Sequence, residues 1–575
     1  MALNIKKYQT PIEKFILPVI LFLYPFIGVN QGVDVTDTTY SLGNYVNQDS
    51  LGMMWRLATY IPNLIGAFLS RLPGGGCLLG MNIYATFFIS VTALFVYRFL
   101  KRFMPGWMIF IGEFIAISLC WCPRVILYNY LTYMFFTFGA MTLIYALVSE
   151  SKKRRLLVLA GFFLGLNVMV RFPNAAECAL ILVVWFYGYI THKDIKTVVN
   201  ETLWCILGFA AGILIPMITI VIQYGAGSYI GMLTQLFGMT GSASDYTLMG
   251  MLSSVISAYW HTISEMLILI PCIVAGTLMF YFKRDKYIMI KKSVFLLGIL
   301  LLIKFYFSEG IITTNYYYYD SMFELTMMTL IIAIIMFVII ITGVIKSATS
   351  EERLLSAAAL IIILITPLGS NNYTFPLVNN LFMVMPIFLW MLRRIIASIG
   401  GDKLIHYSWE IITCAIIILL VIQGALFHSC YSFVDGADGT KRNSEVSGVA
   451  KAKYMITTDM NASELSQLYS YLEDNDLLGK ELITFGNIPG ISYLFDMEPA
   501  IFSTWPDLDS NTVESFDDAL MDISTRDEQP LIIVHDDIEG EVLGQEKYDI
   551  LLDYIANHDY NKIFNNESYT VYLAE

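Results

Sequence analysis

Long apolar runs separated by short polar segments fill the first three quarters of the chain. Each run has about 17–25 residues, which is enough for a helix to cross a bilayer core of roughly 30 Å. We therefore predict thirteen membrane spans with these approximate limits: 13–30, 77–98, 106–122, 126–148, 156–171, 174–191, 203–222, 263–282, 293–308, 323–345, 354–369, 374–392 and 409–428. The pattern indicates a polytopic α-helical membrane protein.

Basic residues fall on alternate connections between these spans. With the N-terminus in the cytoplasm, the inner segments read "YRFLKRFM", "SESKKRR", "HKDIK", "KRDKYIMIKK", "KSATSEER" and "RRIIASIGGDK". Because excess Lys and Arg mark cytoplasmic loops, an odd number of spans predicts an extracytoplasmic C-terminus. The opening "MALNIKKYQTPIEKF" has basic residues before the first apolar run and no small-residue cleavage site, which indicates an uncleaved signal anchor.

The polar tail after the last span has a different pattern. Helical stretches near 463–475 and 545–557 alternate with short apolar strands at "ELITFG", "PAIFST", "PLIIVHD" and "SYTVYLA". This alternation predicts a small α/β domain. We therefore divide the chain into a membrane module at 1–428 and a soluble extracytoplasmic domain at 429–575. The tail has no Walker A sequence and no strand–GxGxxG–helix unit, which argues against nucleotide binding.

Composition and charge agree with this division. The 575 residues are 57% hydrophobic and 14% charged, with a mean hydropathy of +0.62, whereas soluble proteins carry roughly a quarter charged residues. The net charge of −13 combines 29 acidic and 8 basic residues in the tail with 19 acidic and 27 basic residues before it. The acidic tail argues against a nucleic-acid partner. The eight cysteines and six histidines show neither a disulfide framework nor metal-ligand spacing.

Three outer connections stand out. The first, at about 29–76, begins with "GVDVTDTTYSLGN", so Asp34 and Asp37 lie just outside the first span. Its later part, "LGMMWRLATYIPNLIGAFLSRL", is amphipathic and is expected to lie flat in the interface, with Trp55 and Arg56 at headgroup level. The connection at 223–262 is also long, and the one near 309–322 is rich in tyrosine. Long loops on one face are where a site is expected.

Two carboxylates at an extracytoplasmic membrane surface suit particular chemistry. A carboxylate can act as a general base, removing the proton of an acceptor hydroxyl while that hydroxyl attacks a sugar carbon. Asp34 and Asp37 can also hold a divalent cation against a lipid phosphate. Position alone is equally compatible with two solvated carboxylates, or with caps for the next helix.

Several segments together resemble the GT-C fold glycosyltransferases, in particular the protein O-mannosyltransferases and the aminoarabinose transferases that modify lipid A. "TDTTYSLGN" resembles that family's D-E-x-x-Y-x-x-x-A pattern, "CWCPRVILYNYLTYM" its loop and fourth span, and "GFFLGLNVMVRFPNA" its Gly-rich span ending in arginine beside proline. "FGNIPGISYLFDMEPAIFSTW" resembles its outer-domain strand and the sequence after it. The likeness extends over nearly the whole chain. Two positions depart from it, because Thr38 stands where many members have Glu, and Asn44 lies near the usual Ala.

The resemblance implies a membrane enzyme that transfers a sugar from a polyprenyl-phosphate donor. The transfer would occur outside the plasma membrane, to an acceptor that is a cell-envelope glycan, a lipid or a protein. Asp37 falls on the family's catalytic aspartate, and Asp34 would supply the missing second acid. The leaving phosphate needs cations, and the expected ones are Arg171, Arg124 and Lys304. For each of them, snorkelling toward lipid headgroups is the alternative.

A substrate cavity is expected near the outer end of the predicted span 293–308. Glu309 and the tyrosine run at 316–319 would give it a polar, aromatic surface, and we expect Glu309, Tyr316 and Tyr128 to line it. Tyrosines at this depth are mostly interface anchors. The one cofactor considered is a divalent metal ion at Asp34 and Asp37.

Two functions of other classes remain alternatives. A transporter or flippase for a lipid-linked envelope precursor tends to show inverted repeats and charges near the midplane. This sequence has no convincing internal repeat, and its notable charges gather at one face. A noncatalytic envelope scaffold would have no need of Asp34 and Asp37. The sequence therefore favours a glycosyltransferase but names neither the sugar nor the acceptor.

Overall fold

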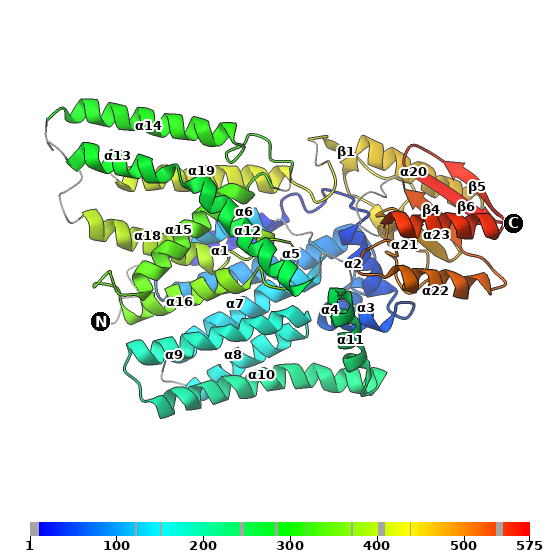
Figure 1. The fold of residues 1–575 in the computed structure, drawn as a ribbon, viewed down its shortest axis with the longest axis horizontal. Coiled ribbons are helices and arrows are strands. Elements are labelled where there is room, and N and C mark those ends of the chain that lie inside the picture. Colours follow the sequence, from blue (N-terminus) through cyan, green and yellow to red (C-terminus); the bar gives the residue numbers. More distant parts are fainter. Residues whose placement is uncertain are drawn as a thin grey trace.

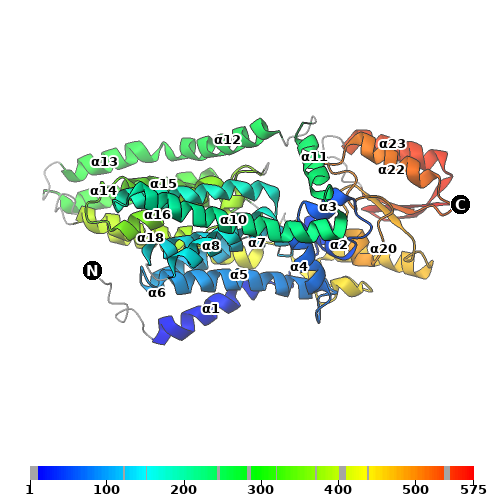
Figure 2. The same cartoon turned by 90° about the horizontal axis from the view of Figure 1, so that it is seen from below.

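The computed structural model describes residues 11–120, 124–149, 152–241, 247–281, 286–318, 320–369, 372–400, 409–436, 439–535 and 544–575. Most helices of the first three quarters lie lengthwise in an elongated bundle (Figure 1). The last quarter forms a unit with a small sheet at one end of that bundle, and the same arrangement is visible in the perpendicular view (Figure 2).

Each predicted span overlaps at least one helix. The first span is broken into η2 (Ile12–Ile16), α1 (Leu17–Leu23) and η3 (Tyr24–Phe26). The other helices up to the C-terminal unit are α2 (Asp37–Val46), α3 (Met53–Leu57), α4 (Tyr60–Ser70), α5 (Leu78–Leu100), α6 (Gly106–Leu119), α7 (Leu127–Val148), α8 (Lys153–Val168), η4 (Phe172–Leu180), α9 (Ile181–Ile190), α10 (Ile195–Tyr224), α11 (Ser228–Gly241), α12 (Leu248–Met266), α13 (Leu269–Tyr281), α14 (Ile288–Ser308), α15 (Phe323–Ile341), α16 (Ser350–Ile365), α17 (Phe375–Asn379), α18 (Val384–Gly400) and α19 (Trp409–Cys430).

The apolar helices give the chain multi-pass membrane character. Within the described residues, seven helical stretches are long and apolar enough to cross a membrane: Leu78–Leu100, Leu127–Val148, Phe172–Ile190, Ile195–Tyr224, Met249–Phe280, Phe323–Ile341 and Thr413–Cys430. The predicted count of thirteen spans is not confirmed. Several of the remaining helices are short, such as α6 with 14 residues and α8 with 16.

One prediction about the outer connections needs correction. The connection at 223–262 is mostly helical, because it contains α11 and α12. The corresponding apolar stretch begins at Met249 rather than near 263. In the amphipathic stretch, Arg56 is held by its own loop: its Nε donates to the Leu51 carbonyl at 2.7 Å, and its guanidinium lies 3.8 Å from the Asp49 carboxylate. The structure gives Arg56 these contacts, and its expected place at headgroup level stays a prediction.

Helices α8 and α10 pack backbone against backbone. A Cβ atom placed on Gly161 would lie 2.0 Å from the Cys205 carbonyl oxygen, and one on Gly165 would lie 2.0 Å from that of Phe209. A Cβ on Gly208 would similarly lie 1.9 Å from the Val158 carbonyl oxygen. Small residues four positions apart allow membrane helices to approach this closely. Larger side chains at these glycines would force the two helices apart.

The predicted α/β unit at the C-terminus is present. Its elements are β1 (Arg442–Ser444), η5 (Ala450–Ala452), β2 (Thr457–Thr458), α20 (Asp459–Asp474), β3 (Leu482–Phe485), α21 (Gly490–Phe495), α22 (Val513–Ser524), β4 (Leu531–His535), α23 (Gly544–Asn557), β5 (Tyr560–Asn565) and β6 (Tyr569–Ala574). The main sheet has the order β3-β4-β6-β5, in which only β3 and β4 are parallel. The segment "PAIFST", predicted as a strand, contributes only an isolated bridge between Pro499 and Leu482. Two hydrogen bonds make this bridge: the Leu482 N–H donates to the Glu498 carbonyl at 2.8 Å, and the Ala500 N–H donates to the Leu482 carbonyl at 3.0 Å.

The two faces of this sheet are buried against different layers. Alternate side chains of a strand point to opposite faces, and Ile483 and Phe485 pack with Phe516 of α22 and Leu551 of α23 in one core cluster. The other face belongs to a cluster that includes Leu468 of α20 and continues into the helical bundle. The C-terminal unit is thus packed directly onto the bundle through an apolar contact.

The orientation in the membrane remains a prediction that chemical labelling can check. In a cysteine-free variant, a cysteine at Glu528, whose side chain is 80% exposed, should react with a membrane-impermeant maleimide added outside intact cells. A cysteine at the exposed Lys196, at the start of α10, should react only after the membrane is opened. Reaction of both cysteines from the same side would contradict an odd number of spans between them.

Candidate functional site

Asp34 organises the turn that leads from the first span into α2. Its carboxylate accepts hydrogen bonds from the Thr36 backbone N–H at 2.7 Å, the Thr36 hydroxyl at 2.5 Å and the Thr38 backbone N–H at 2.8 Å. Its carbonyl oxygen accepts from the Thr39 hydroxyl at 2.7 Å. Burial raises the pKa of the Asp34 carboxyl, and the hydrogen bonds from Thr36 and Thr38 oppose that rise. With 4% of its surface exposed, Asp34 satisfies donors at the start of the helix.

Asp37 occupies the first position of α2 and is only partly buried. The positive end of the helix dipole favours a carboxylate there. Burial chiefly raises the pKa of the Tyr40 hydroxyl one turn later, and the Asp37 charge adds to the rise, which indicates that the two side chains are near one another. The Tyr40 ring packs edge-on against Trp505 of the C-terminal unit, with centroids 5.3 Å apart, and against Trp55 at 6.1 Å. Asp37 therefore stands beside an aromatic cluster built from two distant parts of the chain.

The C-terminal unit holds the start of the first outer loop by backbone hydrogen bonds. The Gly32 N–H donates to the Ile456 carbonyl, and the Ile456 N–H donates to the Asn30 carbonyl, both at 2.8 Å. The Val33 N–H donates to Asp435 Oδ2, also at 2.8 Å. Such a ladder adds the loop to the C-terminal unit as a short parallel bridge.

A second contact fixes the start of α2. The Gly490 N–H, at the beginning of α21, donates to the Val35 carbonyl at 2.8 Å. A Cβ on Gly490 would lie 1.7 Å from Thr39 Oγ1 and 2.6 Å from the Val35 carbonyl oxygen, so only glycine fits without movement. The "GNIPG" segment belongs to the stretch that resembles the family's outer-domain sequence. Its Gly490 contacts the acidic loop at Val35 and Thr39.

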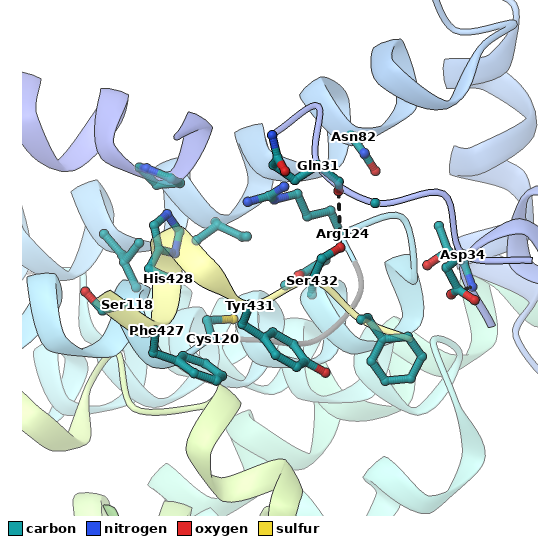
Figure 3. Close-up of a pocket in the computed structure, with 17 residues that line it drawn as sticks. Gln31, Asp34, Asn82, Ser118, Cys120, Arg124, Phe427, His428, Tyr431 and Ser432 are labelled. Carbon is teal, nitrogen blue, oxygen red and sulfur yellow. Dashed lines mark hydrogen bonds between the residues drawn. The ribbon is translucent and has the colours of Figure 1, made fainter. Parts of the chain in front are cut away.

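Asp34 and Arg124, predicted separately, line one cavity. This cavity, of about 70 Å³, lies among the exit of the first span, the α6–α7 connection and the end of α19 (Figure 3). Figure 3 shows Arg124 between Gln31 and Ser432, with Asp34 on one side of it and His428 on the other. The Arg124 guanidinium donates to the Gly28 carbonyl at 2.5 Å and to the Ile27 carbonyl at 3.1 Å. The cavity therefore holds a fixed cation directly at the end of the first span.

The sequence analysis missed several polar residues of this cavity. His428, on α19, stacks near the Tyr24 ring at 4.7 Å, and within the described residues its Nε2 atom is buried without a hydrogen bond. Asn82 and Gln31 add to the polar wall, which also includes Ser118, Tyr431 and Ser432. A histidine inside the apolar run "LVIQGALFHSC" is itself a signal, because ionisable residues in membrane spans are costly and tend to be functional. Asn82 and Gln31 carry no comparable signal in the sequence.

Arg171 lies in a different place from Arg124. It precedes η4, and its Nε donates to Asn174 Oδ1 at 3.0 Å. Together with the buried Glu177 these side chains line a second, very small cavity of about 10 Å³. Asn167 joins the same network by donating to Glu177 Oε2 at 2.7 Å. The structure thus ties Arg171 into a buried polar network and does not bring it into the Arg124 cavity.

Lys304 is exposed on α14, which lies along one edge of the bundle (Figure 1). It lines neither the Arg124 cavity, nor the small cavity at Arg171, nor the three other cavities at Glu309, Glu201 and Cys205. Its long side chain on an apolar helix fits the snorkelling alternative. The expected grouping of Arg171, Arg124 and Lys304 in one place is therefore not observed.

Glu309 lines the largest of these cavities, of about 640 Å³, between α12, the 309–322 connection and α17. Tyr318 and Tyr373 give it aromatic walls, and His261 lies 3.7 Å from Glu324 on its surface. Tyr316 is instead buried in the main core, and Tyr128 packs against that core at the start of α7. Tyr319, within the predicted tyrosine run, lies outside the described residues. The expected cavity thus exists, with a partly different lining.

The acidic pair does not form a metal site of protein ligands alone. No group of three His, Cys, Asp or Glu side chains suited to a metal occurs within the described part of the chain. Both Asp34 oxygens already accept hydrogen bonds from Thr36 and Thr38. Asp34 and Asp37 alone would supply few of the roughly six to eight oxygen ligands that Ca²⁺ takes, whereas Mg²⁺ is commonly held by one or two carboxylates together with substrate phosphates. The divalent ion therefore stays a prediction, and no step is assigned to it.

Comparison with known proteins gave few matches. No protein-family model matches the chain, and no curated protein matches it. Two solved structures of the Archaeoglobus fulgidus oligosaccharyltransferase are similar: the complex with Zn and sulfate, at 11% identity and a TM-score of 0.46, and the apo form, at 12% and 0.44. Each match covers 97% of this chain, with 73% and 74% of the other chain respectively. Likenesses this weak carry no argument about function.

Proposed function

We propose that the chain is a membrane glycosyltransferase that moves a sugar from a polyprenyl-phosphate donor to an extracytoplasmic acceptor. The observation that carries the proposal is the pairing of an acidic helix start with a cationic cavity where the first span ends. Asp34 and Arg124 line that cavity, and Asp37 follows Asp34 by three residues, at the first position of α2. A lipid phosphate stays at the membrane surface, so its partners must lie at a span exit. The donor would be bound there, at the outer leaflet of the plasma membrane.

We assign the general base to Asp37. A base needs an oxygen that can approach the acceptor hydroxyl, and Asp37 is more exposed than Asp34. Three hydrogen bonds to Thr36 and Thr38 already occupy the Asp34 carboxylate. Asp34 would act as a positioning residue that fixes the first turn of α2, and through it Asp37.

The reaction would be a displacement with inversion at the sugar carbon. The acceptor oxygen forms a bond to the anomeric carbon while the bond from that carbon to the phosphate oxygen breaks. The acceptor proton passes to the Asp37 carboxylate, and the electron pair leaves on the polyprenyl phosphate. Arg124 would stabilise the charge that develops on this phosphate, because a fixed guanidinium in a site with little water acts strongly on it.

We assign binding of the sugar acceptor to the larger cavity, which Glu309 lines. Ligand sites commonly have volumes of about 300–1,000 Å³, and this one measures about 640 Å³. Its lining combines carboxylates with the tyrosines Tyr318 and Tyr373 and with Asn315. Such groups hydrogen-bond and stack against hydroxyl-rich molecules, which favours an acceptor with several hydroxyls.

The division into domains is part of the proposal. Residues 1–428 would form the catalytic membrane module, and residues 429–575 an extracytoplasmic domain without catalytic groups of its own. What supports this role is the contact of Gly490 and Trp505 with the first outer loop. The domain would hold the acidic loop in its active conformation.

Arg124 offers a test of the donor site. Lysine keeps the charge but loses the fork of the guanidinium, so Arg124→Lys should raise the donor KM about tenfold, since a hydrogen bond to a charged group contributes roughly 1.5–3 kcal/mol. Steady-state transfer at varied donor concentration measures this change. Arg98→Lys, at an exposed position in the last turn of α5, serves as the control and should leave KM unchanged. An unchanged donor KM in both Arg124→Lys and Arg124→Ala would remove Arg124 from the donor site.

A further inference from the structure

A basic groove lies at the opposite end of the bundle from the C-terminal unit. It is formed by residues 152–155 before and at the start of α8 and by Glu201 and Trp204 on α10, and its volume is about 590 Å³. The starts of α8 and α10 lie at the end of the bundle away from the sheet (Figure 1). We propose that this groove binds the phosphate headgroup of an anionic phospholipid, independently of the proposed sugar transfer.

The groove keeps an excess of positive charge. Its one carboxylate, Glu201, is 4% exposed and lies 2.5 Å from Lys153 Nζ and 3.1 Å from Lys193 Nζ. Two lysines therefore neutralise the single acid. Among the described residues, no carboxylate forms an ion pair with the other three cations of the groove, which are all exposed: Lys152, Arg154 and Arg155. These side chains are available to an anion from the membrane surface.

One wall of the groove has an unsatisfied donor. Within the described residues, the Trp204 indole nitrogen is buried and makes no hydrogen bond. Buried donors of this kind nearly always have a partner, and Trp204 carries the Arg154 guanidinium over its ring at 5.5 Å. A phosphate or ester oxygen in the groove would satisfy the indole N–H and lie next to that guanidinium.

The floor of the groove is rigid. Just beyond it, α8 and α10 meet through Gly161 and Gly208, whose Cβ atoms would lie within 2.0 Å of the facing backbone. Leu157, 1% exposed, fills the space between this contact and the groove. Because backbone contact holds α8 and α10 together, the Trp204 wall on α10 faces the basic segment 152–155 at a fixed distance. A preformed site loses less freedom when it binds a ligand.

The surface next to the groove favours a lipid over a free phosphate ion. On α10, Leu203 is 57% exposed, Ile206 48% and Leu207 54%. These apolar side chains begin within one turn of Trp204 and continue along the helix, which is a candidate span. Acyl chains attached to a phosphate in the groove can lie along this strip. Inorganic phosphate would gain nothing from it.

The test uses the full-length protein purified in neutral detergent, with dioleoyl phosphatidylglycerol as the probe and dioleoyl phosphatidylcholine and inorganic phosphate as comparison ligands. Binding is measured by native mass spectrometry. The double variant Arg154→Gln/Arg155→Gln should weaken phosphatidylglycerol binding about tenfold or more, since each basic side chain near a membrane surface contributes roughly 1 kcal/mol. The double variant Lys291→Gln/Lys292→Gln removes the same charge on α14, away from the groove, and should bind as the wild type does.

A second variant separates the hydrogen bond from charge. Trp204→Phe keeps an aromatic wall but lacks the N–H, and it should weaken phosphatidylglycerol binding several-fold while the melting temperature without lipid stays unchanged. Equal loss in the Arg154/Arg155 and Lys291/Lys292 variants would overturn the proposal, as would equal binding of phosphatidylcholine. Competition by millimolar inorganic phosphate would overturn the lipid assignment and identify a free-anion site.

Discussion

Asp37→Asn should reduce glycosyl transfer about 10²-fold or more, the scale expected for loss of a general base, without loss of expression or donor binding. Asparagine has nearly the same size and shape but cannot accept the acceptor proton. Asp37 lies at the first position of α2, so loss of its charge removes a favourable interaction with the helix dipole of only about 0.3–1 kcal/mol. The fall should therefore appear in kcat, with the donor KM unchanged. Steady-state transfer by the purified variant measures both.

The comparison with two other carboxylates makes this prediction specific. Asp34→Asn should lower the melting temperature. In the wild type, one Asp34 oxygen accepts from the Thr36 N–H and the other from the Thr38 N–H. In the variant an NH₂ group replaces one of these oxygens and cannot accept a hydrogen bond. An unsatisfied buried donor costs about 1–3 kcal/mol. Asp49→Asn, in the same loop with a fully exposed side chain, should change neither activity nor stability. Full activity of Asp37→Asn, with Asp34→Asn inactive but stable, would transfer the base assignment to Asp34.

Gly490→Ala should reduce transfer about as strongly, although this residue lies more than 450 positions from Asp37 in the sequence. The added methyl group would lie 1.7 Å from the Thr39 hydroxyl and 2.6 Å from the Val35 carbonyl oxygen. The acidic loop and α21 must then separate. Overpacking of this kind costs about 1–3 kcal/mol, and a shift of about 1 Å in a catalytic group can reduce the rate roughly 10²-fold.

Gly479→Ala is the matched control for this prediction. It is in the same C-terminal unit, and nothing lies within 4 Å of a Cβ placed on it. We expect wild-type activity from this variant and an intact C-terminal unit in both, as judged by circular dichroism and resistance to limited proteolysis. Wild-type activity of Gly490→Ala would mean that docking of the C-terminal unit is not needed for transfer.

The general architecture follows from the sequence because hydrophobic length and strand alternation are local properties. A run of apolar residues specifies a helix wherever it packs, and each predicted span overlaps a helix. The range 223–262 was predicted as a connection, but its last part belongs to the helix Leu248–Met266. That helix contains a single carboxylate, Glu265, which does not interrupt it. The strand expected at "PAIFST" is reduced to a single bridge to Leu482, made by the Glu498 carbonyl and the Ala500 N–H.

The site was less accessible to sequence reasoning because its parts come from distant segments. Asp34, Arg124 and His428 line one cavity, yet no periodicity relates residues so far apart. Lys304 attracted a functional prediction since charged residues in apolar runs are costly, but its side chain is exposed on α14. The sequence signal for an intramembrane charge does not distinguish an inward-facing residue from a snorkelling one.

The most direct test of the proposed function is turnover of a defined donor by the purified protein in phospholipid vesicles. A polyprenyl-phosphate monosaccharide labelled in the sugar is supplied with an extract of envelope acceptors, and both labelled product and released polyprenyl phosphate are quantified. We predict equal amounts of the two products with the wild-type protein, and about 10²-fold less of both with Asp37→Asn. Movement of intact donor across the bilayer without release of polyprenyl phosphate, at the same rate in both proteins, would contradict the account and indicate a flippase.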